Sequence, residues 1–266
     1  TTAEVEVLTS TGLASIAGNV YHDRNNAGLI GKPTEEGVGA VTVILERITS
    51  SGLTFVAEVT TNPDGSYKFP NLVPGDQYIV RVVHPEGWIN GKDTKGDKGG
   101  DDTAQNDQIT AITLISGANG VEYNFGLRKP ATLSGKVYHD RSDDGKVDPK
   151  EEGVGDVTIT ITWTDKTTGK TVTKETKTDP SGNYTFTDLP PDTEYTVTKK
   201  HPDGWINGKD TAGTHGGTVT DDVIGKVTLT SGDEAKEYNY GLRKKASIAG
   251  KVYHDKNDDG DLNAKD

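Results

Sequence analysis

Residues 135–161 read GKVYHDRSDDGKVDPKEEGVGDVTITI and contain the pattern that decides the fold. The segment Val157-Thr-Ile-Thr-Ile161 alternates apolar and polar side chains, which is the period of a β-strand with one face on a core. No window of the chain shows a sustained 3.6-residue period. We therefore expect an all-β protein whose strands each bury one face.

The tetrapeptide VYHD occurs three times and identifies the chain as a tandem repeat. Its histidines are His22, His139 and His254, separated by 117 and then 115 residues. The string GWINGKDT occurs twice, with Trp88 and Trp205 117 residues apart. Self-similarity of this kind indicates an array of like modules. We expect a tail or the end of a preceding module at 1–12, full modules at 13–130 and 131–245, and the start of a third at 246–266.

Within the second module, turn signals such as Asp179-Pro-Ser-Gly182 separate short alternating runs. These predict strands near 132–138, 156–163, 170–178, 183–187, 193–199, 225–230 and 235–241. About seven strands in a module of this length predict tandem seven-stranded Greek-key β-sandwiches. The linker Arg128-Lys-Pro-Ala131 is too short to act as a flexible tether, so neighbouring modules should nearly touch.

An acidic loop follows the first strand of each unit. In the second module it has the spacing of an EF-hand calcium loop, D-x-[DN]-x-[DN]-G-x₅-E. The residues at positions one, three, five, six and twelve are Asp140, Ser142, Asp144, Gly145 and Glu151, and Asp148 lies between the last two. Alternating oxygens at this spacing wrap one hard cation, and glycine permits the sharp bend. The sequence therefore predicts a calcium site between strands, whereas the alternative is a solvated acidic hairpin loop.

The other two copies of the loop are unequal. The third copy has the matching residues Asp255, Asn257, Asp259, Gly260 and Asp266, with Asp261 and Asn263 between them. In the first module Asp23, Asn25 and Gly28 match, but Ala27 occupies position five and Glu35 comes one residue late. We expect weak or absent calcium binding in the first module.

A second acidic region follows each GWINGKDT string. Its carboxylates are Asp93, Asp97, Asp101, Asp102 and Asp107 in the first module and Asp210, Asp221 and Asp222 in the second. Long loops need some organiser. The two interpretations are looser calcium sites and a mobile, glycine-rich loop.

The composition limits the classes of function. A net charge of −12 disfavours nucleic acid and anionic membranes, which bind through Lys and Arg. No apolar run is long enough to span a bilayer, and the chain has no Cys. No nucleophile or phosphate-loop motif is present, so we expect that the protein is not an enzyme. We also expect a monomer.

The repeated histidines and the tryptophans of the GWIN strings have two interpretations each. The repeated histidines precede the first calcium Asp and should point to the opposite face of the strand, which favours packing over metal binding. Trp88 and Trp205 either cap the core or form an exposed platform for carbohydrate or protein. Trp163, which we align with Glu46 of the first module, is expected to be peripheral.

The order GKVYHD, DDGKVDPKEEGVGDVTITI, TDPSGNYTFTDLPPDTEYTV and YNYGL resembles the B-repeat domain of serine–aspartate repeat (Sdr) surface proteins, within the Cna-B-like, prealbumin-like (transthyretin-type) sandwich group. The resemblance covers the chain past residue 13. It implies an extracellular, cell-wall-anchored bacterial adhesin. Its B modules would bind calcium and stiffen into a stalk that carries an adhesive region.

The resemblance also implies particular ligands. In the second module they are Asp140, Ser142, Asp144, the Lys146 carbonyl and Glu151; in the third unit, Asp255, Asn257, Asp259, the Asp261 carbonyl and Asp266; in the first, Asp23, Asn25 and either Glu35 or Glu36. Some relatives join their first and last strands by a Lys–Asn isopeptide bond. Lys136 and Asn239 occupy those strands here, and the alternative is an asparagine that is hydrogen-bonded within the ladder.

These observations predict a calcium-rigidified stalk whose partners are neighbouring modules of the same chain. Because each loop follows a short linker, calcium should stiffen the junctions, most strongly around Asp140–Glu151. The competing hypothesis is an adhesive module that holds a host protein or glycan through its GWIN surfaces.

Overall fold

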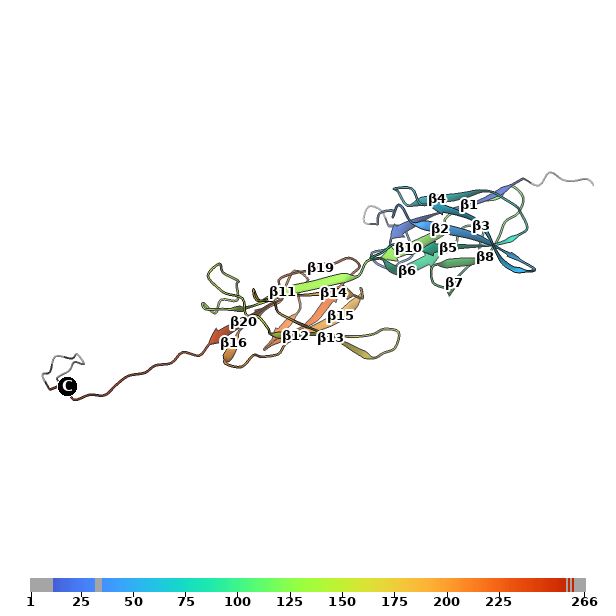
Figure 1. Ribbon diagram of the computed structural model, residues 1–266. Helices are drawn as coiled ribbons and strands as arrows, with labels where there is room; N and C mark the ends of the chain where they lie inside the picture. The colour runs from blue at the N-terminus through green and yellow to red at the C-terminus, as the bar shows by residue number, and fades with distance from the viewer. Residues whose placement is uncertain (1–11, 32–34, 257, 259, 261–266) are drawn as a thin grey trace, which may run out of the picture.

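The computed structural model describes residues 12–31, 35–256, 258 and 260. Two β-sandwiches follow one another along the chain (Figure 1). No helix occurs in the described residues, which confirms the all-β prediction. That part of the chain accordingly contains no helix with the length and hydropathy of a membrane span.

The first module consists of two five-stranded sheets. One sheet has the order β4-β1-β10-β6, with β9 beside β1. Its strands are β1 (Ala14–His22), β4 (Ser66–Leu72), β6 (Ile89–Thr94), β9 (Asn119–Gly120) and β10 (Asn124–Arg128). The other sheet has the order β3-β2-β5-β8-β7. Its strands are β2 (Thr42–Thr49), β3 (Gly52–Thr60), β5 (Gln77–Val83), β7 (Asp101–Gln105) and β8 (Gln108–Thr113).

The second module repeats this topology. Its first sheet has the order β14-β11-β20-β16, with β19 beside β11. The strands are β11 (Ala131–His139), β14 (Asn183–Leu189), β16 (Trp205–Thr211), β19 (Glu234–Ala235) and β20 (Asn239–Lys244). The second sheet has the order β13-β12-β15-β18-β17. Its strands are β12 (Thr158–Thr164), β13 (Thr171–Lys177), β15 (Thr193–Lys199), β17 (Thr218–Thr220) and β18 (Val223–Leu229).

The strand count is higher than the seven we predicted for each module, because β16, β17 and β19 were not expected. The segment 205–211 has too few apolar residues to show strand alternation. It becomes a strand because it pairs antiparallel with β20, from Trp205 opposite Lys244 to Thr211 opposite Asn239. Tertiary pairing, not local propensity, defines this strand.

Each module has its own apolar core. The predicted inward face of β12 is confirmed, since Val157, Ile159 and Ile161 are buried. Trp163 corrects the prediction that it is peripheral. It is also buried and meets the Tyr195 ring edge-on at 5.6 Å. In register it corresponds to Arg47 rather than to Glu46, since Trp163 lies opposite Tyr195 as Arg47 lies opposite Tyr78.

The start of the third unit has no strand partners in the described residues. Ile248 and Val252 are 100% and 99% exposed. In the full modules the equivalent strand is paired on both sides, by β14 and β20 in the second module. Within the described residues the apolar side chains of the third unit therefore enter no core.

A close contact between the first strand and the chain before β20 makes a glycine necessary. A Cβ placed on Gly135 would lie 1.8 Å from the Tyr238 carbonyl oxygen and 2.8 Å from the Tyr184 hydroxyl. That hydroxyl donates a hydrogen bond to the same carbonyl at 2.7 Å. Gly18 of the first module has the equivalent contact with Tyr123, also at 1.8 Å.

We predict that Gly135→Ala destabilises the second module, because the added Cβ overlaps backbone that cannot move aside. The expected loss is about 1–3 kcal/mol, or roughly 5–15 °C in Tm. Calorimetry measures it. Gly225→Ala is the matched control, since its Cβ would meet only Thr196 Oγ1, at 3.7 Å. Equal Tm values for the two variants would contradict the prediction.

Candidate cation-binding loops and the module junction

The acidic loop of the second module begins where β11 ends. Asp140 is completely buried, and its carboxylate closes a tight turn. Oδ1 accepts a hydrogen bond from the Asp144 N–H at 3.2 Å, and Oδ2 accepts one from the Gly145 N–H at 3.1 Å. Gly145 has a φ of 79°, which glycine adopts without strain. The first six positions therefore take up the bend that an EF-like loop requires.

Glu151, at position twelve, folds back across the loop. It is 7% exposed, and its two oxygens accept hydrogen bonds from the Arg141 N–H at 2.8 Å and the Asp148 N–H at 3.1 Å. The remaining predicted ligands of this loop are exposed: Ser142, Asp144, Lys146 and Asp148.

Carboxylates of the acidic loop and of strand β16 surround the buried phenol of Tyr138. Burial raises the pKa of this phenol, and the charges of Asp140, Glu151, Asp144 and Asp210 raise it further, in that order. Its hydroxyl is buried and makes no hydrogen bond to any residue that the structure describes. The region is thus strongly negative, which is the condition that favours cation binding.

The loop carboxylates are hydrogen-bonded to their own backbone in this conformation. In the part of the chain that the structure describes, no three His, Asp or Glu side chains are grouped closely enough to hold a metal ion. Each of these oxygens keeps a second lone pair, with which it could bind calcium while it accepts its backbone N–H. Four predicted ligands of the third unit lie outside the described residues: Asn257, Asp259, Asp261 and Asp266.

The first module forms the same turn although it lacks an acidic residue at position five. The Asp23 oxygens accept hydrogen bonds from the Ala27 and Gly28 N–H groups, both at 3.0 Å. Glu35 is 3% exposed, and its Oε2 accepts a hydrogen bond from the Gly31 N–H at 2.6 Å. Its other oxygen, Oε1, is buried and has no hydrogen-bond partner among the described residues.

The structure also decides between the two glutamates of that loop. Glu36 accepts hydrogen bonds from Arg24 at 2.8 Å and pairs with the His22 ring at 3.1 Å. Glu152 pairs with His139 in the same way, at 3.0 Å. Glu35 is therefore the counterpart of Glu151, and Asn25 keeps a turn contact with the Ala27 N–H at 2.8 Å.

The third copy forms the turn without its module. Asp255 Oδ2 accepts a hydrogen bond from the Gly260 N–H at 2.9 Å. Asp258 and Gly260 have φ values of 56° and 78°, close to 56° for Asp143 and 79° for Gly145. The loop conformation is therefore encoded locally.

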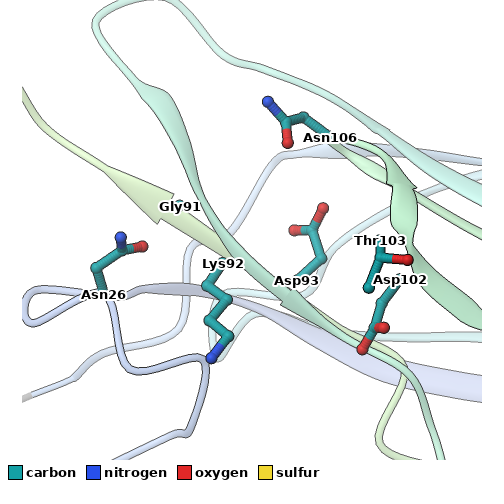
Figure 2. A pocket seen from close by; sticks show the side chains of 7 residues that line it. All are labelled: Asn26, Gly91, Lys92, Asp93, Asp102, Thr103 and Asn106. Atoms are coloured by element: carbon teal, nitrogen blue, oxygen red, sulfur yellow. The ribbon is translucent and has the colours of Figure 1, made fainter. Parts of the chain in front are cut away.

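The second acidic region is a strand–loop–strand segment, and only one of its carboxylates in the first module is buried. Asp93 lies on β6, and burial, together with the charges of Asp107 and Asp102, raises its pKa to about 7. A pocket of about 270 Å³ opens beside Asp93 (Figure 2). In the second module Asp210 is buried beside the Lys199 ammonium. Sequence reasoning missed Lys199, and the available signal was a lysine where the first module has Val82.

The histidines have packing roles, as expected. His22 Nε2 lies 2.9 Å from the Ser231 hydroxyl of the next module, and its ring meets the edge of Trp88 at 5.1 Å. His139 meets Trp205 at the same distance. Both tryptophans are half-buried and pack against the core of their module, so they cap the core.

The two modules touch, as the short linker predicted. The Lys129 N–H donates to Ser231 Oγ at 2.8 Å, and the Gly232 N–H donates to the Lys129 carbonyl at 3.1 Å. Arg128 is 7% exposed and reaches across to Asp192 at 2.6 Å. The linker is therefore held against the second module by both backbone and side chains.

The position of the loops corrects the expected assignment of loops to junctions. Because β11 runs the length of its sheet, the loop 140–151 lies at the exit of the second module, where Arg243 binds Asp143 at 3.0 Å. The contacts between the first and second modules involve His22, which adjoins the loop of the first module. Each loop thus belongs to the junction that follows its module.

The amide of Asn239 has a role in the strand ladder. Its Oδ1 accepts a hydrogen bond from the Lys136 backbone N–H at 2.9 Å. Asn124 makes the same bond to the Asn19 N–H, also at 2.9 Å, in the module that has no lysine there. A hydrogen bond common to both modules favours the ladder interpretation over an isopeptide bond.

Comparison with known proteins adds the family. The SdrD B-like domain family matches residues 14–127 and 131–242. Serine-aspartate repeat-containing protein D of Staphylococcus aureus strain Newman is 33% identical over 232 residues, covering 84% of this chain and 17% of that protein. Serine-aspartate repeat-containing protein F of Staphylococcus epidermidis is 28% identical over 217 residues, covering 81% of this chain and 12% of that protein. The chain thus spans less than a fifth of these relatives.

Among solved structures, the shaft pilin SpaA from Lactobacillus rhamnosus GG is similar, with 12% identity and a TM-score of 0.34, covering 88% of this chain and 99% of that one. The family match covers nearly all of both sandwiches and both acidic loops. The protein is therefore a member of the SdrD B-like domain family, present here in two full copies.

Proposed function

We propose that the chain is a calcium-stiffened spacer, part of the extracellular stalk of a bacterial cell-wall adhesin. Membership of the SdrD B-like family supports a surface location, since the relatives are serine-aspartate repeat-containing proteins. The observation that carries the proposal is the direct link between the ends of an acidic loop and the next module.

The link is the contact between His22 and Glu36, the two residues that flank the loop of the first module. Asp23 directly follows His22, and Glu35 directly precedes Glu36. His22 Nδ1 lies 3.1 Å from Glu36, and its Nε2 lies 2.9 Å from Ser231 of the second module. A cation that draws Asp23 and Glu35 together fixes this pair, and the pair contacts the neighbouring module.

Electrostatics explain why a cation would matter. Clustered carboxylates repel one another, and a cation that binds only the folded state adds stability by mass action. In the second module the proposed ligands are Asp140, Ser142, Asp144, the Lys146 carbonyl, Asp148 and Glu151. The third unit offers Asp255, Asn257, Asp259, the Asp261 carbonyl and Asp266. The first module offers Asp23, Asn25 and Glu35, and binds more weakly because Ala27 has no side-chain oxygen.

The packing of the histidines and tryptophans supports a structural role rather than catalysis or the binding of a host glycan or protein. The histidines and tryptophans recur in both modules and pack in the same way. Lys129 lies over the Trp88 ring at 4.6 Å, and Lys244 lies over Trp205 at 5.0 Å. The tryptophans are thus covered by linker residues, which does not suit an exposed platform for a host glycan or protein.

Calcium should raise the melting temperature of the second module, and Glu151→Gln should abolish most of that rise. Extracellular sites of this type bind at about 10⁻⁴–10⁻³ M. Calcium at about ten to a hundred times the Kd then stabilises by about 1–3 kcal/mol. Differential scanning calorimetry with calcium and with chelator measures the difference.

Glu175→Gln is the matched control, because it removes the same charge from an exposed position on β13. It should keep the full calcium response. A wild-type Tm and small-angle scattering profile that are the same in calcium and in chelator would refute the proposed function.

Removing the Ser231 hydroxyl should loosen the junction between the two modules. Ser231→Ala deletes the partner of both His22 and the Lys129 N–H, so we expect a broader distribution of distances between the modules. Because the chain has no Cys, Glu58→Cys and Thr173→Cys give a unique pair of spin labels for distance measurement by electron resonance.

The control for this experiment is Ser116→Ala, the same position in the first module, where the hydroxyl meets the Gly12 N–H instead. It should leave the distribution unchanged. A Ser231→Ala distribution as narrow as that of the wild type would show that this contact does not fix the junction.

A further inference from the structure

In the second module a positive charge is buried inside the sandwich, namely the ammonium group of Lys199. The Lys199 side chain is fully buried at the end of β15. Its Nζ lies 2.8 Å from Asp222 Oδ1 and 3.0 Å from Asn207 Oδ1. The Gly241 carbonyl at 3.4 Å and Asp210 Oδ1 at 3.5 Å complete the set. Four oxygen atoms from three segments thus surround one ammonium group, which satisfies the rule that buried charges are paired.

The first module has the counterparts of all four oxygen groups, and β6 pairs with β10 as β16 pairs with β20. They are Asn90, Asp93, Asp107 and the Gly126 carbonyl. The carboxylates are also oriented alike. Asp93 Oδ2 accepts a hydrogen bond from the Asp107 N–H at 2.8 Å, and Asp210 Oδ2 accepts one from the Asp222 N–H at 3.0 Å.

The difference between the modules is the cation. Val82 lies opposite Val43 where Lys199 lies opposite Ile159, so the first module has no ammonium at this place. Asp93 is only 8% exposed. Its Oδ1, the atom that corresponds to the lysine contact, is buried and has no hydrogen-bond partner in the part of the chain that the structure describes. The same is true of Asn90 Oδ1.

The neighbouring lysine does not replace the missing charge. Lys92 and Asp93 are adjacent on β6, and their side chains extend in opposite directions (Figure 2). The methylene groups of Lys92 lie over Gly28, where a Cβ would meet them at 2.9 Å. Among the described residues, one oxygen of the buried Asp93 carboxylate and the neighbouring Asn90 Oδ1 therefore lack partners, and no side-chain cation lies beside them.

We propose that the first module binds a calcium ion between Asn90, Asp93, Asp107 and the Gly126 carbonyl, at the position that the Lys199 ammonium takes in the second module. Every donor is an oxygen, the ligand type that hard cations prefer. One oxygen of Asp107 is held by His84 at 2.5 Å, which leaves the other for the ion.

The pocket beside Asp93 supplies access and further ligands. Its volume is about 270 Å³, and Asp102 and Asn106 line it together with Asp93. Figure 2 shows these side chains around the opening. Calcium takes six to eight oxygen ligands, so the pocket leaves room for water molecules to complete the coordination.

The site uses none of the acidic-loop carboxylates and does not rest on the proposed function. For this site the first module is the better calcium binder, whereas for the acidic loops the second module is. The first module has the poorer loop but the additional cation site, whereas the second has the better loop and an internal ammonium.

A reciprocal exchange tests the inference. Val82→Lys supplies the ammonium and should reduce the number of calcium ions bound per chain by one. Lys199→Val removes it from the second module and should add one. Equilibrium dialysis with elemental analysis counts the ions. Val82→Met, which has a similar length and no charge, is the control and should bind as many ions as the wild type.

Anomalous diffraction from wild-type crystals grown in calcium locates the ion directly. We expect a peak at roughly 2.3–2.6 Å from Asp93 Oδ1 and Asn90 Oδ1. Absence of this peak overturns the inference, as does a folded Val82→Lys chain that binds as many ions as the wild type. If Val82→Lys does not fold, the wild-type map and the Lys199→Val count decide.

The outcome is separable from that for the loops. In the double variant Glu35→Gln, Glu151→Gln the anomalous peak at Asp93 should persist. In the wild type, a peak at Asp93 without any calcium effect on stiffness would leave the inference standing and refute the proposed function. Loss of the peak in the double variant would overturn the inference as stated, because it would show that the ion depends on loop carboxylates.

Discussion

Each sandwich depends on the parallel pairing of its first strand with its last. β1 pairs with β10, and β11 pairs with β20. The approach is close enough that Gly18 and Gly135 have no room for a Cβ. This pairing joins the two ends of a module and brings the acidic loop, which follows the first strand, beside the segment that leaves for the next module.

The same pairing explains how an acidic protein buries carboxylates. The residue after the first strand, Asp23 or Asp140, is held by backbone N–H groups of its own turn. The acidic residue on the strand next to the last one, Asp93 on β6 or Asp210 on β16, has different partners in the two modules. Asp210 has the Lys199 ammonium, whereas Asp93 has backbone N–H groups and, among the described residues, no side-chain cation. Repetition of the fold thus conserved the oxygen atoms but not the charge that offsets them.

The ends of the modules repeat as well. Ser231 accepts a hydrogen bond from the Lys129 N–H, and Ser116 accepts one from the Gly12 N–H at 2.7 Å. The following glycine donates back to the same linker residue in both cases, at 3.1 and 2.8 Å. The same two entry contacts thus occur at the start of both modules, which suits the proposed spacer built from repeats.

The sequence by itself determined the features that depend on neighbours along the chain. Alternation predicted the buried face of β12, the repeat revealed the modules, and the spacing from Asp140 to Gly145 predicted a turn that forms even in the isolated third copy at Asp255. Such turns close over a few residues, so no distant partner is required.

Only the tertiary structure decided which glutamate enters the first loop, that Trp163 is buried, that the GWIN segment is a strand, and that Lys199 lies inside an oxygen cage. These features depend on residues brought together from different strands, and a lysine at the end of an alternating run looks solvent-exposed in sequence. The physical reason is that burial and charge compensation are set by the partners across the sheet.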